Sequence, residues 1–165
     1  MKLTLNDLLV SLDFDSDSSL LDEWSWLVGE TATPILAAAN GNMFYADRGA
    51  NDQVRLLDAA RSTIRDVCTT WDDFRSVVTI PDNANDWLTP QRVGDLIETL
   101  GPLPGGHCFG FKVPPCVGGS FNIDNFEHTS LSIHFGLLGQ IAGQVRKYPD
   151  GTPIRSFTVA DPDFG

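Results

Sequence analysis

The sequence predicts an α+β fold, a single domain in which an antiparallel β-sheet meander is flanked by amphipathic helices. A length of 165 residues suits one compact domain, and 42% of the residues are hydrophobic, with four Trp and ten Phe in the chain. Short apolar and β-branched runs, separated by turn signals at about 8 to 12 residues, indicate antiparallel strands. Other segments repeat apolar residues at helical spacing, which predicts helices that cover the sheet.

The N-terminal part begins with a predicted helix over residues 4–12. Thr4 suits an N-cap, and the four leucines of this segment lie on one helical stripe. Residues 13–23 contain no basic side chain and are rich in Ser and Asp, a composition that favours a loop over a long helix. We therefore expect an exposed acidic loop between the first helix and the sheet.

The sheet is predicted from five apolar runs. Asn40-Gly41 separates two of them, and this dipeptide is a strong hairpin signal because both residues tolerate the positive φ of a type I′ turn. The remaining runs follow at similar spacing, which is typical of an antiparallel meander. The predicted strands cover residues 25–28, 33–39, 43–46, 53–57 and 63–69.

Two helices are predicted after the meander. Thr70 suits the cap of a short helix that runs to about residue 78. Thr89 and Pro90 supply the N-cap and first helical position of a longer one, which Gly101 and the following proline end. The segment 81–88 between them is expected to be a loop and a weak internal boundary.

The C-terminal part is expected to return to strands. Alternation in the segment 130–135 places its three apolar residues on one face of a strand, and apolar residues at helical spacing continue to Val145. Strands are expected at 108–113, 130–135 and 154–159, followed by a frayed end over 161–165. We predict one domain, residues 1–165, with parts 1–86 and 87–165 on either side of the weak boundary.

Charge limits the choice of partner. Twenty-two acidic and eleven basic residues give a net charge of -11, and fifteen of the acidic residues lie within residues 1–86. Nucleic acids and anionic membranes both require a basic surface, so this balance excludes them as partners and favours a basic protein. The chain shows no apolar run of signal-peptide or membrane-spanning length, which predicts a cytoplasmic protein, and its three cysteines are expected to be thiols.

The acidic residues are the candidate partner-binding site. Asp13, Asp15 and Asp17 have the spacing that begins a calcium loop, but Ser18 and Trp24 stand where an EF-hand needs Gly and Glu. A solvated or partner-binding surface is therefore the better interpretation. The predicted partner-binding residues are Asp13, Asp15, Asp17, Asp22, Glu23, Asp72 and Asp73.

The histidines and cysteines raise the question of a metal site. Their spacing matches no standard structural-zinc pattern, and Cys108 in a predicted strand suits a small buried hydrophobe. The sequence also has no Gly-x-Ser-x-Gly elbow and no phosphate-binding glycine loop. We predict no cofactor and no catalytic activity, while metal binding stays open for His107, Cys108, Cys116, His128 and His134.

The glycine-rich and aromatic stretch 106–119, followed by Asn125-Phe126 and by the segment 132–141, resembles the Tdi-type immunity proteins of bacterial type VI secretion. Weaker similarity covers 26–28, 41–47, 56–58 and 87–88, so the resemblance spans roughly residues 24–153. In these proteins a GAD-like segment precedes a C-terminal domain of unknown function. The resemblance therefore implies that residues 1–86 are the GAD-like part.

The resemblance implies an activity that composition alone does not. Such a protein binds a cognate toxin effector, in the better-known pairs a nuclease, and neutralises it without turnover. An acidic protein that occludes the basic active-site groove of a nuclease fits the charge of this chain. The alternative functions are a small-molecule or metal-binding domain and an enzyme that acts on a basic substrate.

Overall fold

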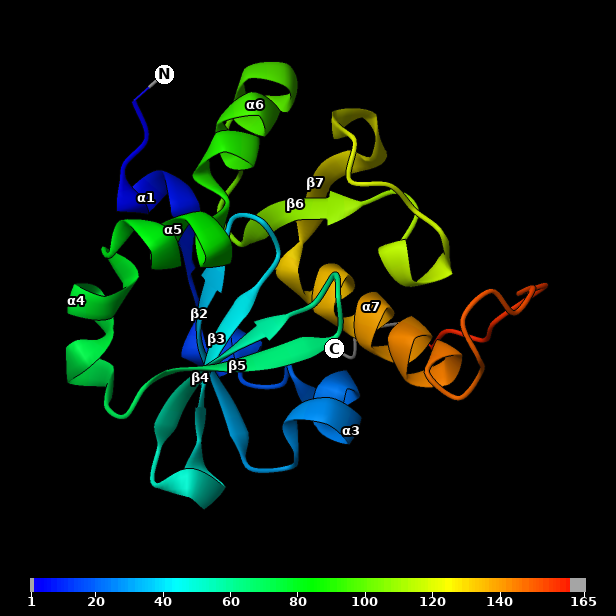
Figure 1. Cartoon of the computed structure of the whole chain (residues 1–165), viewed down its shortest axis with the longest axis horizontal. Helices are drawn as coiled ribbons and strands as arrows, with labels where there is room; N and C mark the ends of the chain where they lie inside the picture. Colours follow the sequence, from blue (N-terminus) through cyan, green and yellow to red (C-terminus); the bar gives the residue numbers. More distant parts are fainter. Residues whose placement is uncertain (1, 161–165) are drawn as a thin grey trace.

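The computed structural model describes residues 2–160. A five-stranded antiparallel sheet lies at its centre in the order β1-β2-β3-β4-β5, and a separate antiparallel pair, β6 and β7, lies beside it (Figure 1). This arrangement confirms the predicted α+β class and the meander. The strands are β1 (Leu9–Ser11), β2 (Ala32–Ala38), β3 (Met43–Asp47), β4 (Gln53–Asp58), β5 (Thr63–Cys68), β6 (His107–Phe111) and β7 (Phe126–Ser130).

Helices cover both faces of the five-stranded sheet. In Figure 1, α1, α4 and α5 lie on one side of the sheet, and α3 and α7 lie on the other. The α-helices are α1 (Leu5–Leu8), α2 (Phe14–Asp17), α3 (Ser25–Val28), α4 (Phe74–Val78), α5 (Pro81–Leu88), α6 (Pro90–Leu100) and α7 (Leu131–Val145). Short 3₁₀ turns complete the chain: η1 (Asp22–Trp24), η2 (Arg48–Ala50), η3 (Trp71–Asp73), η4 (Pro115–Val117) and η5 (Ile123–Asn125).

Two hydrophobic clusters form the core, one on each face of the sheet. Phe44 points into the first cluster, together with the side chains of α4, α5 and α6. Its neighbours Met43 and Tyr45 point into the second, with those of η1 and α7. Because both faces are covered, the central strand β3 is apolar at successive positions and not at every second one.

Three short segments differ from the prediction. The first helix ends at Leu8, and Leu9–Ser11 form the edge strand β1, which pairs with β2. Residues 25–28 form the helix α3 and not a strand, since a run as short as the three apolar residues 26–28 fits either structure. The predicted acidic loop contains α2 and η1, and Leu20 and Leu21 anchor it in the second cluster.

The segment 81–88 is the helix α5 and not a loop. Pro81 stands at its first helical position, where the missing amide hydrogen costs nothing. Trp87 and Leu88 at its end are buried in the first cluster, and the Trp87 ring meets Phe44 edge-on at 6.3 Å between centroids. The burial of these two side chains stabilises the helix more than the Asn and Asp residues, which suggested a loop, destabilise it.

The prediction for residues 130–135 is wrong. Ser130 ends β7 and caps α7 through its hydroxyl, which accepts a hydrogen bond from the Ile133 amide at 3.4 Å. Leu131, His134 and Phe135 are buried at helical spacing, so the period of 3.6 residues was already present in the sequence. The alternation of apolar and polar residues over these six positions suggested a strand and concealed the helical period.

The remaining predictions have mixed outcomes. The hairpin at Asn40-Gly41 is confirmed, but Gly41 alone of the two has a positive φ, so the turn is not type I′. The helix α6 has the predicted limits, and all three cysteines are thiols. Residues 154–159 form no strand, and the end predicted to fray, 161–165, lies outside the described residues. Within residues 2–160, no helix is long and apolar enough to cross a membrane.

Candidate functional site

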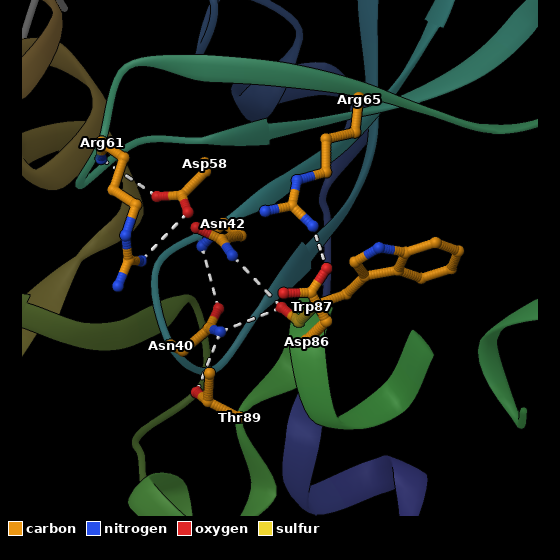
Figure 2. A network of polar contacts seen from close by, with 8 residues as sticks. All are labelled: Asn40, Asn42, Asp58, Arg61, Arg65, Asp86, Trp87 and Thr89. Carbon is orange, nitrogen blue, oxygen red and sulfur yellow. Dashed lines mark hydrogen bonds and ion pairs between the residues drawn. The ribbon is translucent and has the colours of Figure 1, made fainter. Parts of the chain in front are cut away.

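Three connections that are distant in sequence meet at one end of the strands of the sheet. They are the β2–β3 turn, the β4–β5 turn and the junction between α5 and α6 (Figure 2). Polar groups from all three form neighbouring sets of hydrogen bonds and ion pairs: Asn40 and Asn42 with Trp87 and Thr89, Asp58 with Arg61, and Arg65 with Asp86. These sets, here together named the polar junction, consist of Asn40, Asn42, Asp58, Arg61, Arg65, Asp86, Trp87 and Thr89.

Asn40 links the β2–β3 turn to the helix junction. Its Nδ2 donates to the Trp87 carbonyl at 3.0 Å and to the Thr89 hydroxyl at 3.1 Å, while its Oδ1 accepts from the Asn42 amide at 3.2 Å. Buried Asn42 donates a second hydrogen bond to the Trp87 carbonyl at 3.2 Å. One of the last carbonyls of α5, that of Trp87, is thereby satisfied by two side chains of the hairpin.

Thr89 adopts an unusual backbone conformation at this point. Its φ of 44° and ψ of 57° are left-handed, a region in which a β-branched residue is strained. The following Pro90 disfavours the right-handed α conformation at Thr89, and the bond from Asn40 fixes its hydroxyl. Strain held in this way marks positions where the surrounding structure requires one geometry.

Ion pairs join the β4–β5 hairpin to the same site. Asp58 accepts a hydrogen bond from the Arg61 guanidinium at 3.2 Å and another from the Arg61 amide at 3.0 Å. Arg65 pairs with Asp86 of α5 (Figure 2). Arg61 also lies 4.7 Å from the ring centroid of Phe121, and Arg92 of α6 lies 5.2 Å from the same centroid.

A surface pocket opens next to the polar junction. It has a volume of about 570 Å³ and lies between the start of α6 and the loop that contains η5. We name it the α5–α6 pocket, and its lining includes Asn85, Thr89, Gln91, Arg92, Asp95 and Phe121. The lining combines side-chain amides, the Arg92 guanidinium, the Asp95 carboxylate and the Phe121 ring, so the pocket suits the binding of a polar side chain.

The seven predicted partner-binding acids fall into two groups. Asp13, Asp15 and Asp17 lie on α2, and Asp22 and Glu23 lie on η1, in the segment that is anchored in the second cluster. Asp72 and Asp73 lie on η3, whose neighbour Phe74 is buried in the first cluster. The seven residues are therefore distributed over opposite faces of the sheet.

Two of the five N-terminal acids have local structural roles. Asp17 accepts a hydrogen bond from the Asp13 amide at 2.8 Å, and Asp13 accepts one from the Asp15 amide at 3.0 Å. These bonds cap α2. Asp15 and Asp22 are exposed and Glu23 is half-buried, so their carboxylates are available to a partner.

Sequence reasoning missed a second set of exposed acids. Asp82 belongs to α5, and Asp95 and Glu98 belong to α6. Asp95 borders the α5–α6 pocket, and both it and Glu98 border a second hollow of about 410 Å³ along the same helix. The helical spacing of Gln91, Asp95 and Glu98 was a signal for this surface, because residues three and four apart share one helix face.

The histidines are held by backbone carbonyls. His107 donates from Nδ1 to Gly105 at 2.9 Å, and His128 donates from Nε2 to Gly101 at 3.1 Å. Cys108 is fully buried, and burial raises the pKa of its thiol, which opposes the thiolate that zinc requires. Over residues 2–160, no group of three His, Cys, Asp or Glu side chains is placed to hold a metal ion.

His134 is the most deeply buried of the three histidines. Its Nε2 donates a 2.9 Å hydrogen bond to the Gly41 carbonyl in the β2–β3 turn, and burial lowers the pKa of the imidazole to about 4. A Cβ atom on Gly41 would lie 2.6 Å from that nitrogen. A larger residue is therefore excluded by this clash and also disfavoured by the φ of 89° at this position. His134 thus connects α7 to the hairpin that supplies Asn40 to the polar junction.

Comparison with solved structures supports the fold. The structure is similar to the crystal structure of Atu4351 from Agrobacterium tumefaciens, with a TM-score of 0.58 and 11% sequence identity. The similarity covers 81% of this chain and 67% of that chain. At this identity it is evidence of a shared fold alone. No curated protein matches the chain.

Comparison with protein families identifies the segment that contains the pocket. Residues 69–142 match the family described as T6SS immunity protein Tdi1, C-terminal. The match includes α5, α6, β6, β7 and most of α7, and with them the whole lining of the α5–α6 pocket. It begins before the expected internal boundary at 81–88. Residues 69–142 are therefore similar to the C-terminal domain of Tdi1, an immunity protein of the type VI secretion system, and this match confirms the resemblance that the sequence predicts.

Proposed function

We propose that this protein binds and neutralises a cognate secreted antibacterial toxin in the cytoplasm, and that the toxin is a nuclease whose basic active-site groove it occludes. The observation that carries the proposal is the family match over residues 69–142. Net charge supports the choice of toxin, since a nuclease must present positive charge to its substrate and this chain carries -11. Inhibition is by binding, without turnover.

Charge also favours fast recognition. An acidic surface attracts a basic partner before contact, and association that is steered in this way is rapid and falls with ionic strength. Two surfaces of the structure suit this role. One is the N-terminal acidic segment over 13–23, and the other is the face of α5 and α6 that borders the α5–α6 pocket.

The first test is identification of the toxin. The tagged protein is recovered from its native cells, the proteins that accompany it are identified by mass spectrometry, and each is expressed alone and together with the immunity protein. The expected result is one protein that is lethal alone, degrades DNA or RNA in vitro and is inhibited at equimolar immunity protein. A lethal partner without nuclease activity would contradict the toxin class, and the absence of any rescued toxin would contradict immunity.

The second test identifies the interacting surface with three variants of equal charge. The first is D15N/D22N/E23Q in the N-terminal segment, and the second is D82N/D95N/E98Q on α5 and α6. The matched control, D52N/E127Q/D150N, changes exposed acids elsewhere. Since all three remove three charges, a general electrostatic effect lowers affinity equally in each.

The variant that alters the true interface is expected to lower the toxin association rate at least about tenfold more than the control. The difference should shrink in high salt, where exposed charges are screened. Equal small losses in all three variants would show that neither acidic surface covers the toxin.

A further inference from the structure

Two glutamines on α7 hold the backbone of the C-terminal segment. Gln144 donates from Nε2 to the Thr158 carbonyl at 2.6 Å and accepts from the Thr158 amide at 3.3 Å. Gln140 repeats this at Ala160, donating to the carbonyl at 3.0 Å and accepting from the amide at 2.7 Å. Each side-chain amide thus binds both backbone groups of one residue, as a neighbouring β-strand would.

The spacing of the two glutamines fits an extended chain. Residues four apart on an α-helix are separated by about 6 Å along its axis, and residues two apart on a strand by about 6.6 Å. Gln140 and Gln144 therefore meet alternate residues, whose amides and carbonyls point to the same side. After α7 the chain turns back and runs beside the helix in the opposite direction (Figure 1).

These contacts do not depend on the side chains of the bound segment. All four hydrogen bonds go to backbone atoms, so any extended segment can make them. The native occupant is also weakly held, because residues 153–160 are mostly exposed and form no strand. Its apolar side chains Ile154 and Phe157 are 37% and 42% exposed. A competing segment could replace it at low cost.

The surroundings indicate which kind of segment would compete. Ile133 lies on the same face of α7 as the glutamines and is 42% exposed, which extends the strip toward the start of the helix with an apolar contact. On the neighbouring face, the backbone of Glu23 packs against Gly139 of α7, which places the acids of η1 beside the strip. A second copy of this chain, itself at -11, is disfavoured there by charge repulsion.

We propose that Gln140, Gln144 and Ile133 form a docking strip for an extended, basic segment of the toxin, and that residues 158–160 occupy this strip until the toxin displaces them. This inference rests on the proposed immunity function. It adds a second element of recognition, in which backbone pairing supplies affinity for an extended chain and the adjacent acids select positive charge.

Proline substitutions test the competition in the full-length protein. T158P/A160P removes both amide hydrogens that the glutamines accept, and V159P is the matched control because the Val159 amide forms no hydrogen bond to either glutamine. T158P/A160P is expected to raise the apparent toxin affinity on the order of tenfold, since the strip no longer has to be vacated. V159P is expected to leave it within about twofold of the wild type.

Replacing the glutamines tests the strip itself. Q140A/Q144A is expected to lower toxin affinity on the order of tenfold, both alone and combined with T158P/A160P. Amide hydrogen exchange gives an independent measurement. In the free wild type, Thr158 and Ala160 are expected to exchange more slowly than Val159, and toxin binding should abolish that difference as the segment is released.

The outcomes separate the two proposals. Wild-type protein that neutralises its toxin, with unchanged affinity in both T158P/A160P and Q140A/Q144A, would overturn the docking strip and leave immunity intact. A dimer that Q140A/Q144A abolishes, with unchanged toxin affinity, would show that a second copy is the occupant and would also overturn it. Failure of the wild type to bind any toxin would overturn both.

Discussion

Trp24 donates a hydrogen bond from its indole nitrogen to the Phe135 carbonyl at 2.9 Å, across 111 residues of sequence, and both side chains are fully buried. Trp26 repeats the contact one helical turn further on, with a 3.2 Å hydrogen bond to the Gly139 carbonyl, and its ring stacks on that of Trp24. The acidic segment is thus fixed to α7 by two tryptophans. The acidic side chains of this segment therefore have a defined position relative to α7.

Replacing Trp24 with Phe is expected to destabilise the protein by about 1–3 kcal/mol, because the substitution removes the buried donor and part of a large buried ring. Urea unfolding followed by circular dichroism measures the change. Trp71, which is 44% exposed, is the matched control, and W71F should fall within about 0.5 kcal/mol of the wild type. Equal effects of the two substitutions would contradict a specific role for Trp24.

Alanine substitutions at Gly139 of α7 and Gly94 of α6 test how closely each helix is packed at its glycine. A Cβ atom on Gly139 would lie 2.8 Å from the Glu23 carbonyl oxygen, whereas on Gly94 it would meet only Leu3, at 3.6 Å. Alanine is favoured over glycine in a helix by about 1 kcal/mol, so G94A should stabilise the protein by about 0.5–1 kcal/mol.

G139A is expected to destabilise it by about 1–3 kcal/mol, because the clash is with backbone atoms that cannot rotate away. Thermal unfolding of the two variants checks both signs. A stabilising G139A would show that η1 is free to move away from α7.

Elements with strong local signals could be predicted from the sequence. The strands on either side of Asn40-Gly41 and the helix that starts at Pro90 were recognised because a turn dipeptide and a helix-capping proline act within a few residues. The edge strand β1 was missed since only its pairing with Ala37 and Ala38, far along the chain, makes it a strand. Tertiary contact decides such short segments.

Less of the candidate site could be predicted. Composition identified the acidic character of residues 13–23, but it did not show that Asp72 and Asp73 lie across the sheet from them. The polar junction joins Asn40 to Thr89, two residues that no local pattern connects. Gln140 and Gln144 are ordinary helix residues until the chain folds back beside them.

The polar junction is expected to depend more on Asn40 than on the hydroxyl of Thr89. N40A removes donors to two acceptors at the α5–α6 junction and should cost about 1–3 kcal/mol of stability. T89G loses one hydrogen bond but relieves the strain of a left-handed threonine, so its net effect should lie within about 1 kcal/mol of zero. Equilibrium unfolding in urea checks both values, and a T89G variant less stable than N40A would reverse this assignment.

His134 is expected to make stability depend on pH between about 4 and 6.5. Burial lowers the pKa of its imidazole to about 4 in the folded protein, below the unperturbed value near 6.5, so the unfolded chain binds more protons in this window. The free energy of unfolding therefore falls as the pH drops through it, by at most about 1.4 kcal/mol per pH unit from this group. H134Q keeps an amide donor for the Gly41 carbonyl but does not titrate. Urea unfolding at several pH values should give a shallower slope for H134Q than for the wild type, and identical slopes would mean that His134 is already exposed to solvent protons.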